Sequence, residues 1–179
     1  KEALKLLKKK KNLRLVDATN YSYKEILRLV SSNEEFLVQT EDFNKFSKND
    51  FKVVSKKKPN TKQMRNLMFA FNICRYTKSN AIVLARNETT VGIGSGQPSR
   101  LDSCQIAIDK MKKFIDTNDE VVAASDAFFP FVDGIEKLVQ SGVTAVIQPS
   151  GSIRDKEIIK FANETDTILV FSKTRHFRH

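Results

Sequence analysis

Apolar residues recur every three or four positions in two long stretches of the chain, and this spacing predicts amphipathic helices. The first helix is predicted at residues 61–76, with Asn60 or Thr61 as its N-cap. The second is predicted at residues 100–114, directly after a glycine-rich loop. Asp155 is predicted to cap the last of three shorter helices, at 1–10, 135–140 and 156–162.

Short apolar runs between these helices predict strands. The runs at 26–30 and 36–39 flank Ser31-Ser32-Asn33 and predict a hairpin. A second turn is predicted at Asn87-Glu88, and the other strands are predicted at 13–16, 51–54, 81–85, 90–93, 121–124, 145–147 and 168–171. Because strands alternate with helices, the pattern predicts an α/β fold in which helices are layered on a mixed sheet.

The chain has 179 residues, of which 40% are hydrophobic and 29% charged, so it is long enough for a compact domain with its own core. Its longest apolar runs are too short to cross a bilayer. A helix-like stretch without an initiator Met opens the chain, which suggests a piece of a longer protein. Cys74 and Cys104 stand far apart in sequence and are interpreted as buried free thiols of a cytosolic protein.

The formal net charge of +10 raises the hypothesis of a nucleic-acid-binding module. The lysine runs at 8–11 and 56–58 are also typical of a solvated surface, or of attraction for an anionic small molecule. No motif of a known nucleic-acid-binding fold supports the first alternative. Both histidines stand in the last four residues, and no cluster has the spacing of zinc ligands, which argues against a zinc enzyme.

Four loops, at 78–80, 92–100, 125–134 and 148–155, carry residues that a hydrophobic core does not select. Ligands of α/β folds gather at loops that follow strands. Asn80, at the start of a predicted strand, offers an amide donor and acceptor to a planar substrate. Turn or cap chemistry is the alternative explanation for this residue.

The next two loops carry a cation and an aromatic cluster. Arg100 follows glycines in a G-x-G-x-G spacing that does not fit a dinucleotide fingerprint, yet an arginine at a helix N-terminus favours an anion. The alternative is a tight connection between strand and helix. Phe128, Phe129 and Phe131 flank one proline between two aspartates, which suits a slot for a heteroaromatic ring such as a pterin. The alternative is that these rings are tucked into the core.

Taken in order, the strings KSNAI, VGIGSGQPSR, ASDAFFPFVDGI, AVIQPSGSIRD and RHFRH closely resemble the family of aminoimidazole carboxamide ribonucleotide (AICAR) formyltransferase/IMP cyclohydrolase bienzymes. The resemblance is dense from about residue 50 to His179 and looser before it. It implies a carboxy-terminal formyltransferase subdomain at 51–179 and a preceding segment of the same region at 1–50. It also implies a cytidine-deaminase-like fold without zinc.

The resemblance implies transfer of a formyl group from 10-formyltetrahydrofolate to the 5-amino group of AICAR, in the synthesis of IMP. It gives a catalytic role to Asn80. It implies that the nucleotide substrate is bound by Arg100, Phe128, Arg175 and Phe177. It implies that the folate is bound by Asp133, Leu101, Pro130 and Ser152. A potassium-binding patch of some relatives is matched by Thr77, Ser79 and Asp126.

The resemblance further implies a cytoplasmic homodimer without a nucleic-acid or membrane partner. In this family a separate amino-terminal domain closes the ring to IMP, and a Lys-His pair supplies the base and the oxyanion donor. No Lys-His dipeptide occurs in this chain, so we expect the chain alone to be inactive. Two alternatives stay open, a catalytically silent structural subdomain and a basic nucleic-acid-binding module.

Overall fold

The computed structural model describes residues 2–20, 27–43, 45–115 and 120–179. By their internal contacts the residues fall into two compact units, Lys1–Phe43 and Asn44–His179. Every site residue predicted from the sequence belongs to the second unit.

The first unit consists of a short helix, α1 (Glu2–Leu7), and a hairpin of β1 (Leu27–Ser32) and β2 (Glu35–Thr40). The two strands pair antiparallel, and Asn33 takes a positive φ of 52° in the turn between them. The hairpin prediction is therefore confirmed, although Ile26, its predicted first residue, lies outside the described residues.

The strand predicted at 13–16 is wrong. These residues lie in irregular backbone, and Leu13 and Val16 are 44% and 89% exposed. A strand needs a neighbour to pair its N–H and C=O groups, and none of the other described segments pairs with this one. A short apolar run is therefore not sufficient to predict a strand.

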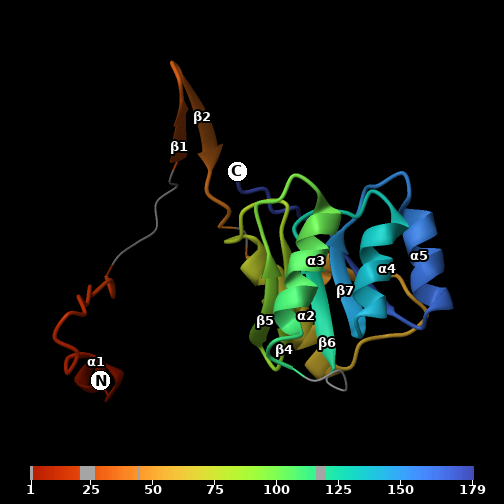
Figure 1. Ribbon diagram of the computed structural model, residues 1–179, viewed down its shortest axis with the longest axis horizontal. Coiled ribbons are helices and arrows are strands. Elements are labelled where there is room, and N and C mark those ends of the chain that lie inside the picture. Colours follow the sequence, from red (N-terminus) through yellow and green to blue (C-terminus); the bar gives the residue numbers. More distant parts are fainter. Residues whose placement is uncertain (1, 21–26, 44, 116–119) are drawn as a thin grey trace. The chain divides into compact units, whose positions relative to one another are not determined.

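The second unit is built on a mixed sheet with helices on both faces (Figure 1). Its elements are η1 (Lys48–Asp50), β3 (Phe51–Val53), α2 (Thr61–Cys74), β4 (Ile82–Arg86), β5 (Thr89–Gly94), α3 (Arg100–Met111), β6 (Val121–Ser125), α4 (Val132–Gln140), β7 (Val143–Pro149), α5 (Asp155–Glu164) and β8 (Ile168–Ser172). The strands lie in the order β3-β8-β7-β6-β4-β5. β6, β7 and β8 run parallel, and the other neighbouring pairs are antiparallel. The predicted layered α/β fold with a mixed sheet is confirmed.

The two faces of this sheet carry separate hydrophobic cores. α3, α4 and α5 lie side by side on one face, and α2 packs on the other (Figure 1). Successive residues of a strand point to opposite faces, so Ala123 of β6 belongs to the first core and Ala124 to the second. Since β6 and β7 are covered on both faces, their sequences read as unbroken apolar runs.

The predicted cap of α2 is confirmed, and that of α5 is wrong. Asn60 accepts a hydrogen bond from the Gln63 N–H, and the Gln63 side chain accepts one from the Asn60 N–H, both at 2.8 Å. At α5 the N-cap residue is Arg154, and Asp155 is the first helical residue. The Asp155 carboxylate accepts from the Gly151 N–H at 2.8 Å instead, so it closes the preceding loop.

The turn predicted at Asn87 and Glu88 joins β4 to β5. Both residues have positive φ, 50° and 53°, which a tight two-residue hairpin turn requires. Asn66 of α2 accepts a hydrogen bond from the Glu88 N–H at 2.8 Å. A helix from one face of the sheet thus holds the tip of the hairpin.

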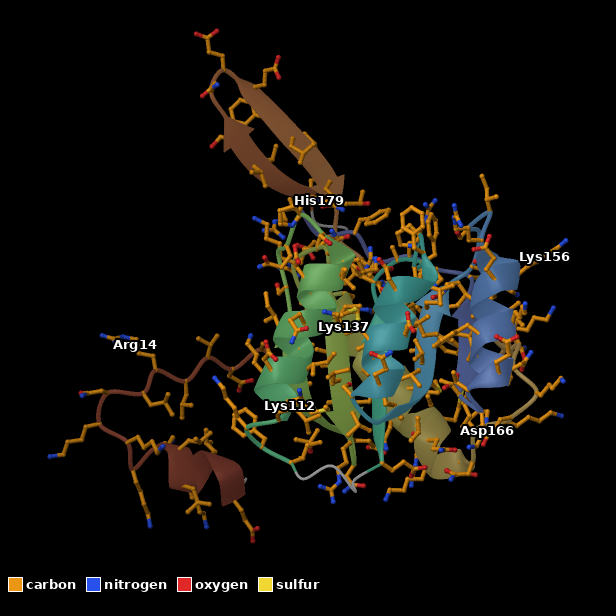
Figure 2. The ribbon with its side chains drawn as sticks, turned by 45° about the vertical axis from the view of Figure 1, so that its right-hand side comes forward. Arg14, Lys112, Lys137, Lys156, Asp166 and His179 are labelled. Carbon is orange, nitrogen blue, oxygen red and sulfur yellow. The ribbon has the colours of Figure 1, made fainter. Side chains whose placement is uncertain are left out.

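Basic side chains are distributed over several elements of the second unit. Lys112 follows the end of α3, Lys137 lies on α4 and Lys156 on α5 (Figure 2). Such a distribution is typical of a solvated surface. Among the helices that the structure describes, none has the length and apolar character needed to cross a membrane.

Candidate functional site

A pocket of about 560 Å³ opens where three of the four predicted loops meet residues of the terminal segment. Its lining comes from segments that are far apart in the sequence: Asn80, residues 98–101, 127–131 and 133–134, Arg175 and Phe177. The volume falls within the range of small-molecule sites, which is about 300–1,000 Å³. The fold therefore brings the loops at 78–80, 92–100 and 125–134 together at one cavity, and the loop at 148–155 is not part of its lining.

Arg100, the first residue of α3, is the centre of a buried hydrogen-bond network. One of its terminal nitrogens donates to Ser125 Oγ at 2.8 Å and to Asp126 Oδ1, and the other donates to Asn80 Oδ1 at 2.8 Å. The Arg100 and Asp126 side chains are 10% and 0% exposed. Three acceptors fix the plane of the guanidinium, and the carboxylate offsets its charge. The Arg100 guanidinium is therefore held in a fixed orientation, and the residue lines the pocket.

Asn80 is held by the loop in front of α3. Its side-chain nitrogen donates to the carbonyls of Gln97 and Pro98, at 2.9 and 3.1 Å, which uses both amide hydrogens. The backbone carbonyl of Asn80 accepts a hydrogen bond from Ser103 Oγ at 2.8 Å. Since Oδ1 accepts one bond from Arg100, that oxygen keeps one lone pair for a ligand.

The glycines that precede α3 mainly serve the packing of that helix. A Cβ at Gly92 would collide with the Ala107 carbonyl, and one at Gly94 with the Ser103 carbonyl, because α3 lies directly on β5. Gly96 has a positive φ of 68°, which glycine adopts without strain. The tight strand–helix connection thus accounts for the G-x-G-x-G spacing without a ligand.

The loop after β6 forms an aromatic wall of the pocket. Phe129 is buried beneath Gly134, where an added Cβ would collide with the ring. Phe128 is half-buried and Phe131 is 53% exposed, and both line the pocket. The Arg154 guanidinium lies over the Phe131 ring at 4.8 Å. Phe129 is therefore tucked into the core, whereas the positions of Phe128 and Phe131 fit a slot for a heteroaromatic ring.

Asp133 lies in the first turn of α4, exposed at the edge of the pocket. Its Oδ1 accepts a hydrogen bond from the Gly134 N–H at 2.7 Å. A carboxylate is favourable there because the N-terminus of a helix carries partial positive charge. Asp133 thus stabilises its own helix, and its carboxylate has further lone pairs for donors on a ligand.

The end of the chain, residues 173–179, crosses the loops that surround the pocket. The His176 N–H donates to the Asp126 carbonyl at 2.9 Å. The Ser79 N–H donates to the Arg178 carbonyl at 2.9 Å, and the Arg178 N–H donates to Ser79 Oγ at 3.2 Å. These backbone contacts fix the position of the terminal segment.

Side chains of this segment alternate between the core and the pocket. The His176 ring is buried, with its centroid 4.4 Å from that of Phe71 and 5.2 Å from that of Phe46. Arg175 and Phe177, on either side of it, line the pocket. This packing of His176 was not predicted from the sequence, in which the alternation within RHFRH is its local signal.

Most of the predicted substrate and folate residues line the pocket: Asn80, Arg100, Leu101, Phe128, Pro130, Asp133, Arg175 and Phe177. Ser152 lies outside the lining, and its Oγ accepts from the Arg154 N–H at 3.1 Å. The loop of Ser152 still reaches the pocket, because Arg154 stacks on Phe131.

The three residues predicted to bind potassium also lie outside the lining of the pocket. Thr77 is buried and donates to the Ile73 carbonyl at 3.0 Å, and Ser79 accepts from the terminal segment. Asp126 Oδ2 is buried, and no group in the described part of the chain bonds to it. Among the described residues, no group of three or more His, Cys, Asp or Glu side chains could hold a metal ion.

Cys74 and Cys104 are free and buried, as predicted. Burial raises the pKa of the Cys74 thiol well above its ordinary value and that of the Cys104 thiol to about 12. The main cause is the lost hydration of the thiolate, and the nearby charge of Arg100 opposes it only in part. Both thiols stay protonated near neutral pH, so neither supplies a nucleophile.

The sequence of the chain is similar to known proteins of one family. The chain matches the family profile described as AICARFT/IMPCHase bienzyme over residues 1–110. It is 45% identical to a bifunctional purine biosynthesis protein PurH of Chlorobium phaeobacteroides (strain BS1), over 98% of this chain. It is 44% identical to the PurH protein of Aquifex aeolicus (strain VF5), over 99% of this chain. The chain spans about a third, 34%, of the length of these curated relatives.

A solved structure of a dCMP deaminase from the cyanophage S-TIM5 aligns with 63% of this chain and 98% of its own. The TM-score is 0.42 and the sequence identity is 17%. The absence of zinc, which was part of the predicted fold, stays a prediction.

Proposed function

The chain belongs to the AICARFT/IMPCHase bienzyme family, and we propose on that premise that it forms the carboxy-terminal part of an AICAR formyltransferase. The complete enzyme would transfer a formyl group from 10-formyltetrahydrofolate to the 5-amino group of AICAR, and a further domain would act as IMP cyclohydrolase. One observation carries the proposal. A single pocket joins a fixed guanidinium to an aromatic wall and a carboxylate, as a nucleotide and a pterin together require.

In this proposal the nucleotide end of the pocket is formed around Arg100 and Arg175. Arg175 is exposed and stacks on Phe177 at 5.6 Å, so its guanidinium is available to a phosphate group. Asp126 offsets much of the charge of Arg100, so Arg100 suits a neutral acceptor such as the AICAR carboxamide oxygen. Phe128 would lie against the base.

The folate end is assigned to the other side of the same lining. A pterin presents a flat ring and amide-type N–H donors, which an apolar wall and a carboxylate complement. Leu101 and Pro130 would contact the ring, and Asp133 would accept its N–H groups. Ser152 is assigned to the rim, because its loop is joined to the pocket through Arg154 and Phe131.

Formyl transfer needs an oriented amine, a base and hydrogen-bond donors for the developing oxyanion. The AICAR amine is a weak nucleophile, since its lone pair is delocalised into the ring. Asn80 has one lone pair left on Oδ1, which could accept an amine N–H and orient the group. The Lys-His pair that the family resemblance implies for proton removal does not occur in this chain, so we assign those steps to the remainder of the enzyme.

Potassium would bind beside the pocket, through Thr77, Ser79 and Asp126. The residues fit a hard cation, because Asp126 Oδ2 is buried without a hydrogen bond from any described group. Their oxygen donors are a poorer match for zinc, which favours nitrogen and sulfur ligands. When bound, the cation would supply positive charge that fixes the Asp126 carboxylate beside Arg100.

We also propose a cytoplasmic homodimer without nucleic-acid or membrane partners. The same proposal divides the chain into a preceding segment at 1–50 and a formyltransferase subdomain at 51–179. Support comes from the resemblance of the motifs, and the two structural units divide close to that boundary, at Phe43.

Calorimetric titration of the complete enzyme with AICAR tests the nucleotide end. Arg175→Ala should weaken binding by about 10- to 100-fold, since a hydrogen bond to a charged group contributes about 1.5–3 kcal/mol. Binding should also weaken as salt is added. The matched control is Lys173→Ala, an exposed cation of the same segment outside the pocket. Equal affinities of the two variants would contradict the proposal.

A further inference from the structure

Gln148 is a fully buried amide to which no described residue offers a hydrogen bond. It lies near the end of β7, it is 0% exposed, and neither its side-chain oxygen nor its nitrogen bonds to any residue that the structure describes. An unpaired buried amide is costly, and such groups are rare in folded proteins. An apolar residue would avoid this cost, so the glutamine points to a role beyond packing.

Extending the register of β6 and β7 by one residue brings Gln148 beside Ser125. In the parallel pair of β6 and β7, Ala123 lies opposite Val146 and Ala124 lies opposite Ile147. Two positions further along each strand stand Ser125 and Gln148. Ala123 and Val146 belong to the core beneath α3, α4 and α5, and every second residue returns to the same face. Adjacent strands lie about 4.8 Å apart, so the two polar side chains are neighbours on that face.

Ser125 directly supports Arg100. Its Oγ accepts from the guanidinium at 2.8 Å and donates its own hydrogen to the Ala127 carbonyl at 2.6 Å. A hydroxyl oxygen accepts two hydrogen bonds, so Ser125 has room for one more donor. The Gln148 amide carries two N–H donors, and rotation about its last side-chain bond is soft. The Gln148 N–H donors, which bond to no described group, therefore lie beside a Ser125 oxygen that can accept one more hydrogen bond.

We infer that Gln148 is a positioning residue for Arg100 and acts through Ser125. When nucleotide occupies the pocket, the Gln148 amide donates to Ser125 Oγ and fixes the hydroxyl that supports the guanidinium. Gln148 lies outside the pocket lining, so its effect is on nucleotide affinity and not on the reacting atoms. The inference rests on the proposed function, in which Arg100 contacts AICAR.

The first test is Gln148→Met in the complete enzyme, which keeps the side-chain length and removes the amide. We expect the KM for AICAR to rise about three- to tenfold, the range of one neutral hydrogen bond. The KM for 10-formyltetrahydrofolate should stay constant, and the stability should be equal or higher. If the Gln148 amide has only a structural role, the variant should show the same stability but an unchanged KM for AICAR. That result would overturn the inference. Ile147→Met, on the opposite face of β7, is the matched control.

A double-mutant cycle with Ser125→Ala tests whether Gln148 acts on Arg100 through Ser125. If Gln148 acts through Ser125, Gln148→Met adds nothing to the KM for AICAR once Ser125 is alanine. Equal effects in both backgrounds would overturn the inference. If the Met variant does not fold, Gln148→Asn, which withdraws the amide by one methylene, is measured in the same way. A wild-type enzyme that does not bind AICAR would instead overturn the proposed function.

Discussion

Arg100 and Asp126 form an ion pair that is almost wholly withdrawn from water, with side chains 10% and 0% exposed. Asn80 and Ser125 accept further hydrogen bonds from the same guanidinium. Removal of one partner of such a pair leaves the other charge buried and uncompensated. The pair therefore contributes to the stability of the second unit as well as to the candidate site.

Arg100→Leu should lower the free energy of unfolding by about 3–5 kcal/mol, because the Asp126 carboxylate is left without its cation. Urea denaturation of both proteins measures the difference. The matched control is Arg154→Leu, which breaks an exposed ion pair with Glu157 and a stacking contact with Phe131. That change should cost about 0–2 kcal/mol. Losses of equal size would show that burial of the pair is unimportant.

Gly94→Ala should destabilise the protein by about 3 kcal/mol or more, since the added Cβ would collide with the Ser103 carbonyl of α3. Gly151→Ala is the comparison, because Gly151 has a positive φ of 111° but an added Cβ would meet no atom of the described residues within 4 Å, its chain neighbours aside. Its cost is backbone strain of about 1–2 kcal/mol. Urea denaturation that gives the same loss for both changes would refute close packing of α3 as the reason for Gly94.

Local signals explain why much of the fold could be predicted from the sequence. The Asn60 capping box and the Asn87-Glu88 turn each depend on residues within a few positions of one another. Helix ends were less accurate, and α3 stops at Met111 instead of residue 114. The apolar pattern identified that helix but not the turn in which it ends.

Contacts between distant segments could not be predicted in the same way. Val53 of β3 lies opposite Val170 of β8, and no local pattern encodes that pairing. The motifs predict Asn80 as a site residue, but only the structure shows that its amide nitrogen already donates to two carbonyls within the chain. The sequence places Gln148 in a candidate ligand-binding loop, and only the structure shows that it is a fully buried residue of β7.

Stability should depend on pH through Cys104, whose pKa burial raises to about 12 from an ordinary value of 9.0. The folded protein holds this proton more tightly than the unfolded chain does. The contribution of the protonated Cys104 thiol to the free energy of unfolding is therefore complete below pH 9 and is lost as the pH rises towards 12. The loss is at most about 1.4 kcal/mol per pH unit for one thiol. Urea denaturation at pH 8 and 10.5 should show a smaller fall for Cys104→Ala, which leaves Cys74 in place. An identical fall would exclude this thiol as the cause.

Asp133→Ala should have two separable effects. Loss of the hydrogen bond to the Gly134 N–H at the start of α4 should cost about 1 kcal/mol of stability. If the carboxylate also accepts pterin N–H groups, the KM for 10-formyltetrahydrofolate should rise about 5- to 150-fold, with little change for AICAR. Asp133→Asn keeps one acceptor for the helix and is the control. A variant that loses stability alone, with unchanged folate KM, would restrict Asp133 to its helix.

The purified 179-residue chain should not catalyse formyl transfer by itself. Arg100 and Asn80, which are proposed to orient a substrate, line its pocket, but its histidines are unsuited to act as the base. His176 is buried among aromatic rings, and His179 stacks on Phe177 at the very end of the chain. Without the base and its oxyanion donor the rate should fall by well over the roughly 10²–10³-fold that one lost oxyanion donor costs.

Release of tetrahydrofolate from a mixture of the chain, AICAR and 10-formyltetrahydrofolate measures this activity directly. The complete enzyme, assayed in parallel, is the positive control. Calorimetry on the same sample of the chain shows whether AICAR still binds, which distinguishes a silent but assembled half-site from a chain that has lost its fold. Robust turnover by the chain would mean that a residue within it acts as the base, and the assignment of that step to the remainder of the enzyme would be wrong.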